Sequence, residues 1–408
     1  MIRQALIAGG GIGGLAAALA CVRGGWEVRL FERAAVFSEV GAGIQLGPNV
    51  TRALIAWDLA GALKDLAAFP SQLQVRDALR GRELGALALG DAIAQRYGAP
   101  YATVHRADLH QMLLAQLCRH GGAKLRLGHS VEQFTQTADA IVVRARRTGV
   151  TGSRVQDAEI EGDALVGADG LWSAVRRGLL GDAAPRVTGH LAYRALVPQA
   201  SLPARLRSSQ ITVWLGPRLH LVQYPVRRGE WLNLVGVVHA GRGVARVLAD
   251  PQNWDNVTDG AELRAVLAGN CAALVDLIHA VGGWRLWVLC DRLPVAGAGE
   301  LARGRTALLG DAAHPMRPYL AQGAGMAIED AAELGRALQQ ALDPAFDVAT
   351  MLARYAQSRW QRVARVQRRS ARNGLIFHAE GPLRWGRDAA LRAIGTRLLD
   401  QPWLYAGA

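Results

Sequence analysis

The residues Gly9 to Gly14, near the start of the chain, have the types and spacing of a dinucleotide-binding loop. Gly9, Gly11 and Gly14 fill the GxGxxG pattern between a short apolar run, residues 4–8, and an apolar helical pattern. The glycines permit a tight turn and close approach of the backbone to a pyrophosphate, and the following helix offers free N–H groups and partial positive charge. The loop therefore predicts dinucleotide binding, without separating FAD from NAD.

An acidic residue follows this loop at the distance that dinucleotide binding requires. Glu32 ends a second β-type run, residues 27–32, where a carboxylate hydrogen-bonds the hydroxyls of an adenosine ribose about 20 residues after the glycines. The same negative charge would repel the 2′-phosphate of NADP. Glu32 and the glycines together make dinucleotide binding the strongest prediction from the N-terminal residues.

A second chemical motif, Leu308–Pro315, lies at the end of another buried apolar run. Asp311 follows that run at the carboxyl end of an expected strand, where parallel sheets bind ligands, and its carboxylate can accept hydrogen bonds from ribitol hydroxyls. Capping of a helix is the alternative for Asp311. Downstream, Gly323 and Ala324 open a long helix, about 323–341, where a flat ring could approach backbone N–H groups. The dipole of that helix could then stabilise negative charge on reduced flavin.

A third motif, the Gly-Ala-Asp-Gly stretch at 167–170, also follows a buried apolar run. Asp169 stands at its centre, and the arginines Arg176 and Arg177 lie in the helix that follows. The motif is either part of a ligand site or a plain turn, because Asp-Gly is a favoured turn dipeptide.

The pattern of expected strands and helices, which must position these motifs, changes along the chain. A strand–turn–helix–strand unit over residues 4–32 opens a doubly wound parallel sheet. Residues 71–100 alternate polar and apolar positions between turn signals. Strand-like runs within about 183–290, with helices over 261–281, predict a mixed or antiparallel sheet with helices on one face. The remainder, 347–400, is helical, basic and amphipathic.

Length and cysteine use set the broad class. A chain of 408 residues predicts two domains, with or without a helical tail. No apolar run reaches the roughly 18 residues of a membrane-spanning helix, and the N-terminal run is too short for a signal peptide, so a cytoplasmic protein is expected. The four cysteines lack metal-binding spacing and are expected to be buried, reduced thiols, with no metal site: Cys21, Cys118, Cys271 and Cys290.

The formal net charge of +13 comes almost entirely from arginine, because the lysines are only Lys64 and Lys124. Compositional bias is one explanation, and a nucleic-acid or membrane surface is another. No nucleic-acid motif accompanies the charge, so we expect no nucleic-acid partner. A positive potential that attracts an anionic dinucleotide and an anionic substrate is the interpretation we prefer.

In their order along the chain, the three motifs resemble the single-component flavoprotein aromatic hydroxylases. That family includes salicylate, 3-hydroxybenzoate, 4-hydroxybenzoate and 6-hydroxynicotinate hydroxylases, and the likeness extends over nearly the whole chain. It implies an α/β fold with a Rossmann-like FAD-binding domain of the 4-hydroxybenzoate hydroxylase type, an interleaved mixed-sheet substrate domain and a C-terminal helical tail. The expected divisions are 1–70, 101–182 and 288–345 for FAD, 71–100 and 183–287 for substrate, and 346–408 for the tail.

The resemblance implies roles at matching positions of this chain. Glu32 and Arg33 would flank the adenosine ribose, and Val131 would meet the adenine through its backbone. Arg106 would lie near the ribityl-phosphate chain, and Asp169 would serve both FAD and NAD(P)H. The full set expected to hold the cofactor is Gly9, Gly11, Gly14, Glu32, Arg33, Gly43, Arg106, Val131, Asp169, Asp311, Gly323 and Ala324. The tail would pack on the FAD domain and carry no chemistry.

The resemblance also implies that NAD(P)H reduces the flavin and that a flavin C4a-hydroperoxide transfers one atom of O₂ to an aromatic ring. The protein must then withdraw a phenolic proton. His220, Val222 and Tyr224 share one face of a strand, because side chains alternate with period two. We therefore expect His220 and Tyr224 side by side, facing the substrate; a structural histidine is the alternative for His220.

Arg194 and Arg317 are the candidates for holding an anionic substrate, since a guanidinium can grip a carboxylate with two hydrogen bonds. A solvated surface arginine is the alternative for each. Gln45 and Tyr319 are expected beside the substrate. At both positions 6-hydroxynicotinate hydroxylases usually carry histidine, and 3-hydroxybenzoate 6-hydroxylases carry glutamine where this chain has Pro318, so the substrate stays open between a phenolic acid and an N-heteroaromatic. A flavin oxidase or dehydrogenase on the same fold, a charge-driven binding module and a homodimer also stay open.

Overall fold

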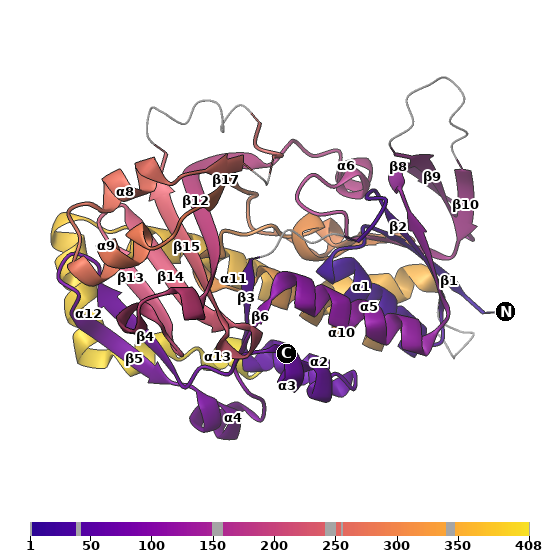
Figure 1. The fold of residues 1–408 in the computed structure, drawn as a ribbon. Coiled ribbons are helices and arrows are strands. Elements are labelled where there is room, and N and C mark those ends of the chain that lie inside the picture. Colours follow the sequence, from indigo (N-terminus) through magenta and orange to yellow (C-terminus); the bar gives the residue numbers. More distant parts are fainter. Residues whose placement is uncertain are drawn as a thin grey trace.

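The computed structural model describes residues 2–37, 42–148, 158–240, 250–253, 256–339 and 347–407. Two large β-sheets stand at opposite ends of the molecule, and long helices run between them (Figure 1). The expected domain boundary at residues 345 and 346, and the last residues of the helix expected over 323–341, lie outside the described residues.

The first large sheet is the predicted dinucleotide-binding sheet. Its strands, in spatial order, are β18 (Ala302–Arg303), β19 (Thr306–Leu308), β11 (Ala164–Gly167), β1 (Gln4–Ala8), β2 (Glu27–Glu32) and β7 (Ala123–Leu127). All neighbours pair in parallel except β18 with β19. The central strands are buried on both faces, which explains their unbroken apolar runs. The doubly wound parallel sheet is confirmed.

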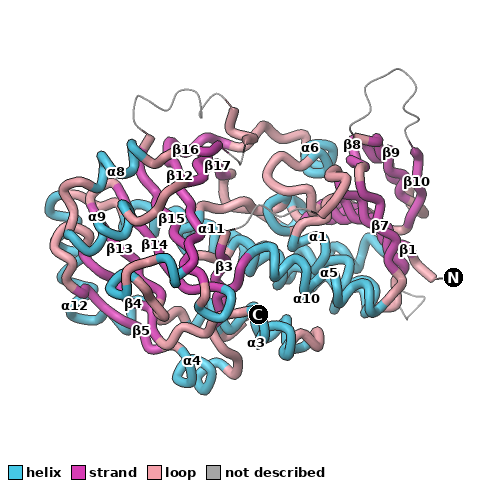
Figure 2. The backbone as a smooth tube through the Cα atoms, in the orientation of Figure 1, coloured by secondary structure: helices cyan, strands magenta, loops and turns pink. Residues whose placement is uncertain are grey.

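Helices cover this sheet and connect it to smaller elements. The helices α1 (Ile12–Arg23), α5 (Arg106–His120) and α10 (Gly323–Gln339) pack together as one layer (Figure 2). A three-stranded sheet of β10 (Ala158–Gly162), β9 (Ile141–Arg147) and β8 (His129–Gln136) extends one side. The two-stranded sheet of β3 (Gly43–Leu46) and β6 (Ala102–His105) leads toward the second large sheet. Shorter helices are α2 (Pro48–Ala56), α3 (Ala60–Leu66), α4 (Gly90–Tyr97) and α6 (Ala174–Leu180).

The second large sheet is mixed, as the sequence predicts. Its order is β16 (Asn256–Thr258), β17 (Trp284–Asp291), β12 (Arg186–Pro198), β15 (Trp231–His239), β14 (Leu219–Val226), β13 (Ile211–Gly216), β4 (Gln72–Asp77) and β5 (Glu83–Ala88). Only β13 and β4 pair in parallel. Strands from 72–88 therefore join strands from 186–291, while the domain bounds themselves stay a prediction. Helices α8 (Ala261–Leu267) and α9 (Ala272–His279) bury their apolar residues against one face.

The C-terminal residues form α11 (Val348–Phe377), α12 (Gly381–Leu399) and α13 (Pro402–Tyr405). Helix α11 packs on α10 and on the β18–β19 edge of the first sheet. Helix α12 instead packs on β5 of the second sheet, where Gly395 lies directly against Gly85 and the Thr396 hydroxyl donates to the Ala86 carbonyl at 3.0 Å. The expectation that the whole tail packs on the FAD domain is therefore wrong for α12.

The cysteines and helix hydropathy refine two expectations. Cys21 and Cys290 are buried, but Cys118 is exposed and Cys271 is half-buried, so the expectation of four buried thiols is wrong for these two. Cys118 lies on the side of α5 that faces solvent. Among the described residues, no helix is both long and apolar enough to cross a membrane.

Candidate functional site

The first glycine loop has the geometry of a phosphate cradle. Gly9 has a φ of +100°, and a Cβ on Gly14 would lie 1.8 Å from the Gly9 carbonyl oxygen. Both positions therefore require glycine for the turn itself. A Cβ on Gly11, in contrast, would meet no atom of the described residues within 4 Å apart from its two chain neighbours. Gly11 thus opens onto free space at the N-terminus of α1, where a pyrophosphate can approach.

Glu32 is held firmly beside this loop. Its Oε2 accepts a hydrogen bond from the Gly10 amide at 2.7 Å, and its Oε1 accepts one from the Ala34 amide at 2.9 Å. A carboxylate has about four acceptor sites, so further sites remain for ribose hydroxyls. The hydrogen bonds fix the side chain at the carboxyl end of β2. A residue that binds the ribose of adenosine is expected at this position.

Asp169 lies in the third motif and caps α6. Its carboxylate accepts hydrogen bonds from the Ala174 amide at 2.7 Å, the Val175 amide at 3.1 Å and the Ser173 hydroxyl. Burial raises the pKa of Asp169 even though these hydrogen bonds act in the opposite direction. The structure gives Asp169 a role in local geometry, while its contact with FAD and NAD(P)H stays a prediction.

Asp311 behaves as a group in a concave site. Its side chain is exposed, and it makes no hydrogen bond to another described side chain or backbone group. Protein nevertheless surrounds it closely enough for desolvation to raise its pKa, while His314 and Arg106 act to lower it. Solvent reaches the carboxylate of Asp311 from one side, and protein surrounds it on the others. Such a group suits a ligand that enters from the solvent side.

A buried ionic network supports the loop that carries Asp311, and few features of the sequence indicate it. Asp330 accepts hydrogen bonds from His314 Nε2 at 2.5 Å, the Gly310 amide at 3.0 Å and Arg359 Nε at 2.8 Å. Asp330 is itself desolvated, but the charges of His314 and Arg359 lower its pKa to about 2. The one available signal was the adjacent pair of acidic residues Glu329 and Asp330, which directly follows the run of small and apolar residues 323–328.

Four further cofactor candidates differ in their exposure to solvent. Val131 is buried, Arg33 is exposed, and Gly323 and Ala324 are half-buried at the first turn of α10. Just before that turn, Ala321 has a φ of +52°, a left-handed conformation that costs a residue with a Cβ about 1 kcal/mol or more. Such strain is typical of functional loops that the surrounding structure holds in place.

His220 and Tyr224 share one face of β14, as predicted, but they are not side by side. Val222 separates them, and four residues of strand span about 13 Å. His220 is buried, and its Nδ1 lies 2.8 Å from His378 Nε2 at the end of α11. Burial lowers the pKa of His220 to about 3, so the imidazole is neutral. His378 is a site residue that the sequence analysis missed.

Tyr224 lies at the other end of this face, near the first sheet. It is directly opposite Asn233 on β15, and Asn233 Oδ1 accepts a hydrogen bond from the Gly43 amide at 2.6 Å. A Cβ on Gly43 would lie 2.5 Å from the Tyr224 ring. The absence of a side chain at Gly43 therefore lets β3 reach the second sheet, and the two halves of the molecule meet here.

Arg194 extends from β12 onto the same face. Its Cζ is 3.3 Å from the centroid of the Trp287 ring, its Nε is buried without a hydrogen bond, and it has no ion pair with a described carboxylate. Burial lowers its pKa to about 9, with a further contribution from Arg106. Since Arg106 influences both Asp311 and Arg194, the cofactor side and the second sheet adjoin at this residue.

The other three substrate candidates already have partners. Arg317 Nε donates to Asp291 at 2.7 Å. Gln45 accepts a hydrogen bond from the Tyr101 hydroxyl at 2.9 Å. The Tyr319 hydroxyl is hydrogen-bonded to His190, and burial raises the pKa of Tyr319. Arg194 thus differs from Arg317 in having an unpaired charge.

Comparison with known proteins agrees with this geometry. The family model described as "FAD binding domain" matches residues 3–208 and 292–370. The chain belongs to this family. A 3-hydroxybenzoate 6-hydroxylase of Polaromonas naphthalenivorans is 40% identical over 98% of this chain and 95% of its own. A 6-hydroxynicotinate 3-monooxygenase of Bordetella bronchiseptica is 35% identical over 92% of each chain. A solved salicylate hydroxylase substrate complex has a TM-score of 0.80 and 26% identity over 100% of this chain and 96% of its own.

Membership of the FAD-binding family confirms the resemblance drawn from the three motifs. The protein is an FAD-dependent monooxygenase, with FAD as its cofactor and NAD(P)H as reductant. The residues fit the cofactor: the open space at Gly11 suits its pyrophosphate, and the accessible carboxylate of Asp311 suits a polyol chain. Which residue contacts which part of FAD remains a prediction.

Proposed function

We propose that the protein hydroxylates a small phenolic acid of the hydroxybenzoate type. The observation that carries this proposal is the unpaired guanidinium of Arg194. It lies on the face of the second sheet that carries His220 and Tyr224, where that sheet adjoins the cofactor side. A partly buried charge without a counter-ion costs several kcal/mol in desolvation, and a bound carboxylate would offset that cost. The similarity to a 3-hydroxybenzoate 6-hydroxylase supports the same substrate class.

The arrangement of the face suits a ring with a carboxylate and a hydroxyl at separate positions. Arg194 and Tyr224 would hold the carboxylate at the end near Gly43. His220, about 13 Å along the strand from Tyr224, would meet the hydroxyl from the other end. The ring would lie between them, over Val222 and its neighbour Val235. These apolar side chains would keep water away from the reacting carbon.

The state of His220 defines its role toward the phenolic proton. A neutral imidazole has one acceptor nitrogen, and the contact of Nδ1 with His378 leaves Nε2 to face the substrate. Because burial lowers its pKa to about 3, His220 is a weak base. We infer that its Nε2 accepts a hydrogen bond from the hydroxyl and draws the proton away from the oxygen as the ring reacts, while the contact of Nδ1 with His378 fixes the imidazole. Bound FAD, once reduced by NAD(P)H, would supply the activated oxygen.

An N-heteroaromatic acid such as 6-hydroxynicotinate is the second candidate. The similarity to a 6-hydroxynicotinate 3-monooxygenase favours it, and its carboxylate would use Arg194 equally well. Gln45 supplies the specific observation: it is buried, and its oxygen is engaged by Tyr101, so its amide N–H₂ can point toward a ring oxygen or nitrogen. Both candidates share the carboxylate site and differ at the ring.

A substrate panel tests the proposal. Salicylate, 3-hydroxybenzoate, 6-hydroxynicotinate and 3-hydroxybenzyl alcohol are compared for stimulated NAD(P)H consumption, product identity and incorporation of label from ¹⁸O₂. We expect labelled product from a hydroxybenzoate, and much weaker stimulation by the alcohol, which lacks the carboxylate. Preference for 6-hydroxynicotinate would select the second candidate. Substrate oxidation without incorporated label would overturn both and indicate an oxidase or dehydrogenase.

A further inference from the structure

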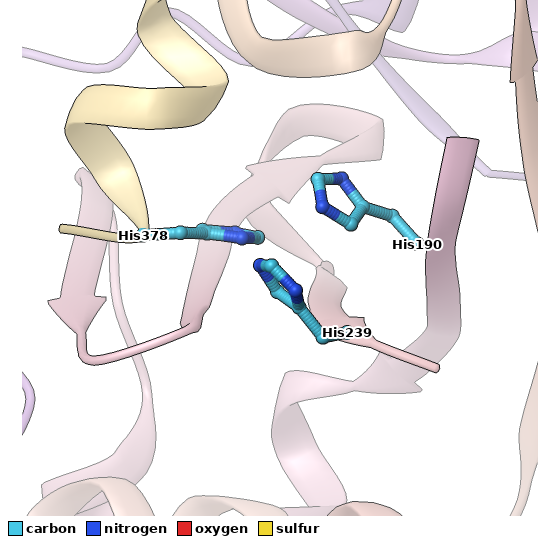
Figure 3. A group of neighbouring side chains, drawn as sticks. All are labelled: His190, His239 and His378. Carbon is cyan, nitrogen blue, oxygen red and sulfur yellow. The ribbon is translucent and has the colours of Figure 1, made fainter. Parts of the chain in front are cut away.

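Three histidines from separate segments converge at the far end of the second sheet (Figure 3). His190 lies on β12 directly opposite His239 on β15, and His378 follows the last turn of α11. One ring nitrogen of each lies within 4.8 Å of those of the other two. The ring centroids are 4.4 Å apart for His190 and His239, and 5.1 Å from each of these to His378.

His190 and His378 are buried and His239 is half-buried, and each ring offers one nitrogen lone pair in its neutral form. Burial lowers the pKa of His190 to about 4 and that of His378 to about 2, and neighbouring histidines add to both effects. Burial lowers the pKa of His239 as well. Neutral imidazole is the form that binds metal ions, and the convergence of three ring nitrogens within 4.8 Å is the observation on which the site depends.

The surroundings do not exclude a cation. Arg317 and Arg387, which face the cluster, are paired with Asp291 and Asp388 respectively. Arg218 lowers the pKa of His239, and Glu380 raises it. No single positive charge therefore dominates the cluster.

Two details indicate a site that is prepared for a ligand. Nδ1 of His378 is buried and has no hydrogen-bond partner among the described residues, although buried polar atoms are nearly always paired. Nδ1 of His190 is hydrogen-bonded to the Tyr319 hydroxyl, which fixes the orientation of the ring and leaves Nε2 available. A hydrogen bond of this kind behind a ligand is typical of histidine metal sites.

We propose that His190, His239 and His378 form a binding site for a divalent transition-metal ion, with Zn²⁺ as the best fit. Three imidazoles with an open fourth position match tetrahedral zinc, and the lack of a carboxylate or carbonyl ligand disfavours Mg²⁺ and Ca²⁺. Zn–N bonds of about 2.0–2.1 Å place the nitrogens roughly 3.4 Å apart, so small side-chain rotations complete the set.

An ion at this site would act on the hydroxylase through His378. The ion would hold the ring that now contacts His220, and so would slow the transfer of the phenolic proton. This consequence rests on the proposed function, whereas the binding of the ion does not. Zn²⁺ is then expected to inhibit hydroxylation without displacing FAD.

The test uses the FAD-loaded protein after dialysis against a chelator. Zn²⁺ is titrated by calorimetry, and Co²⁺ serves as a spectroscopic probe because a tetrahedral site gives intense d–d bands to the red of the flavin absorption. His239→Ala removes one ligand from a half-buried position, and His279→Ala, at an exposed position on α9, is the matched control. Tyr319→Phe removes only the hydroxyl that supports His190.

We expect one Zn²⁺ per chain and tetrahedral Co²⁺ bands in the unmodified protein and in His279→Ala. His239→Ala should bind at least about 100-fold more weakly, and Tyr319→Phe about 10-fold more weakly, because a supporting hydrogen bond contributes roughly 10- to 100-fold to metal affinity. Equal Zn²⁺ affinity in His239→Ala and His279→Ala would overturn the site, as would Co²⁺ bands of octahedral type. Binding without inhibition would retain the site and reject only its effect on proton transfer.

Discussion

The guanidinium of Arg194 lies over the indole of Trp287, with its Cζ 3.3 Å from the ring centroid. Such a contact contributes about 0.5–2 kcal/mol, which is less than the several kcal/mol that desolvation of an unpaired ion costs. Trp287 therefore positions the charge without neutralising it. The balance favours a bound anion, and it makes Arg194 the first residue to test.

Arg194→Gln should raise the KM for a hydroxybenzoate at least about 30-fold, because loss of one partner of a buried charge pair costs 2 kcal/mol or more. Arg317→Gln is the matched control, since Arg317 is already paired with Asp291. Steady-state kinetics with 3-hydroxybenzoate and with 3-hydroxybenzyl alcohol measure the effect. Equal changes in KM for the acid in both variants would argue against a carboxylate site at Arg194.

His220→Phe should lower kcat for hydroxylation about 10²- to 10⁴-fold while FAD stays bound, since that is the usual contribution of a positioned proton acceptor. Tyr224→Phe, at the other end of the face, should instead act mainly on KM. Product formation and NAD(P)H consumption are measured separately in single turnovers. Unchanged product formation in His220→Phe would remove His220 from the mechanism.

The glycine loop offers a sharp comparison between two alanine substitutions. Gly14→Ala should destabilise the apoprotein, because its Cβ would lie 1.8 Å from the Gly9 carbonyl oxygen. Gly11→Ala should leave the Tm of the apoprotein nearly unchanged, because its Cβ meets no atom of the described residues within 4 Å apart from its chain neighbours. It should still weaken FAD binding, because the added methyl group would occupy the space where we expect the pyrophosphate. Circular dichroism and flavin absorbance separate the two effects. Full FAD binding by Gly11→Ala would place the pyrophosphate elsewhere.

Asp330→Asn should cost about 3–5 kcal/mol of unfolding free energy, because Arg359 would be left buried with a weakened partner. The pKa of Asp330 falls from 3.8 to about 2 on folding. Its ionisation therefore stabilises the fold fully above pH 3.8, and this stabilisation, about 2 kcal/mol, is lost as the pH falls toward 2. Urea unfolding at neutral and acidic pH tests both points, and the variant should lose less stability on acidification than the parent chain.

The parts of the fold that the sequence predicted best depend on local chemistry. The first glycine loop, Glu32 and the parallel sheet follow from turn geometry and from apolar strands buried on both faces. The second sheet was also predicted, because residues 71–100 alternate polar and apolar positions and residues 183–290 contain strand-like runs with a helical pattern over 261–281. Each of these signals is contained within a few dozen residues.

The parts that could not be predicted depend on long-range contacts. His378 meets His220 across 158 positions of the chain, and no local pattern links them. Alternation placed His220, Val222 and Tyr224 on one face, but the expectation that His220 and Tyr224 lie side by side overlooked the length of strand that Val222 occupies between them. Arg194 and Arg317 were equivalent in sequence, and only the position of Asp291 distinguishes them.

The place of His378 beyond α11 has a consequence for synthesis of the protein. Every strand described in both large sheets is encoded before residue 309, and so emerges from the ribosome first. A polypeptide cut short by a stop codon after α10 would contain all these strands and the glycine loop. It would still lack the imidazole that His220 touches, so under the proposed mechanism the nascent chain becomes competent for hydroxylation only after residue 378 has been translated.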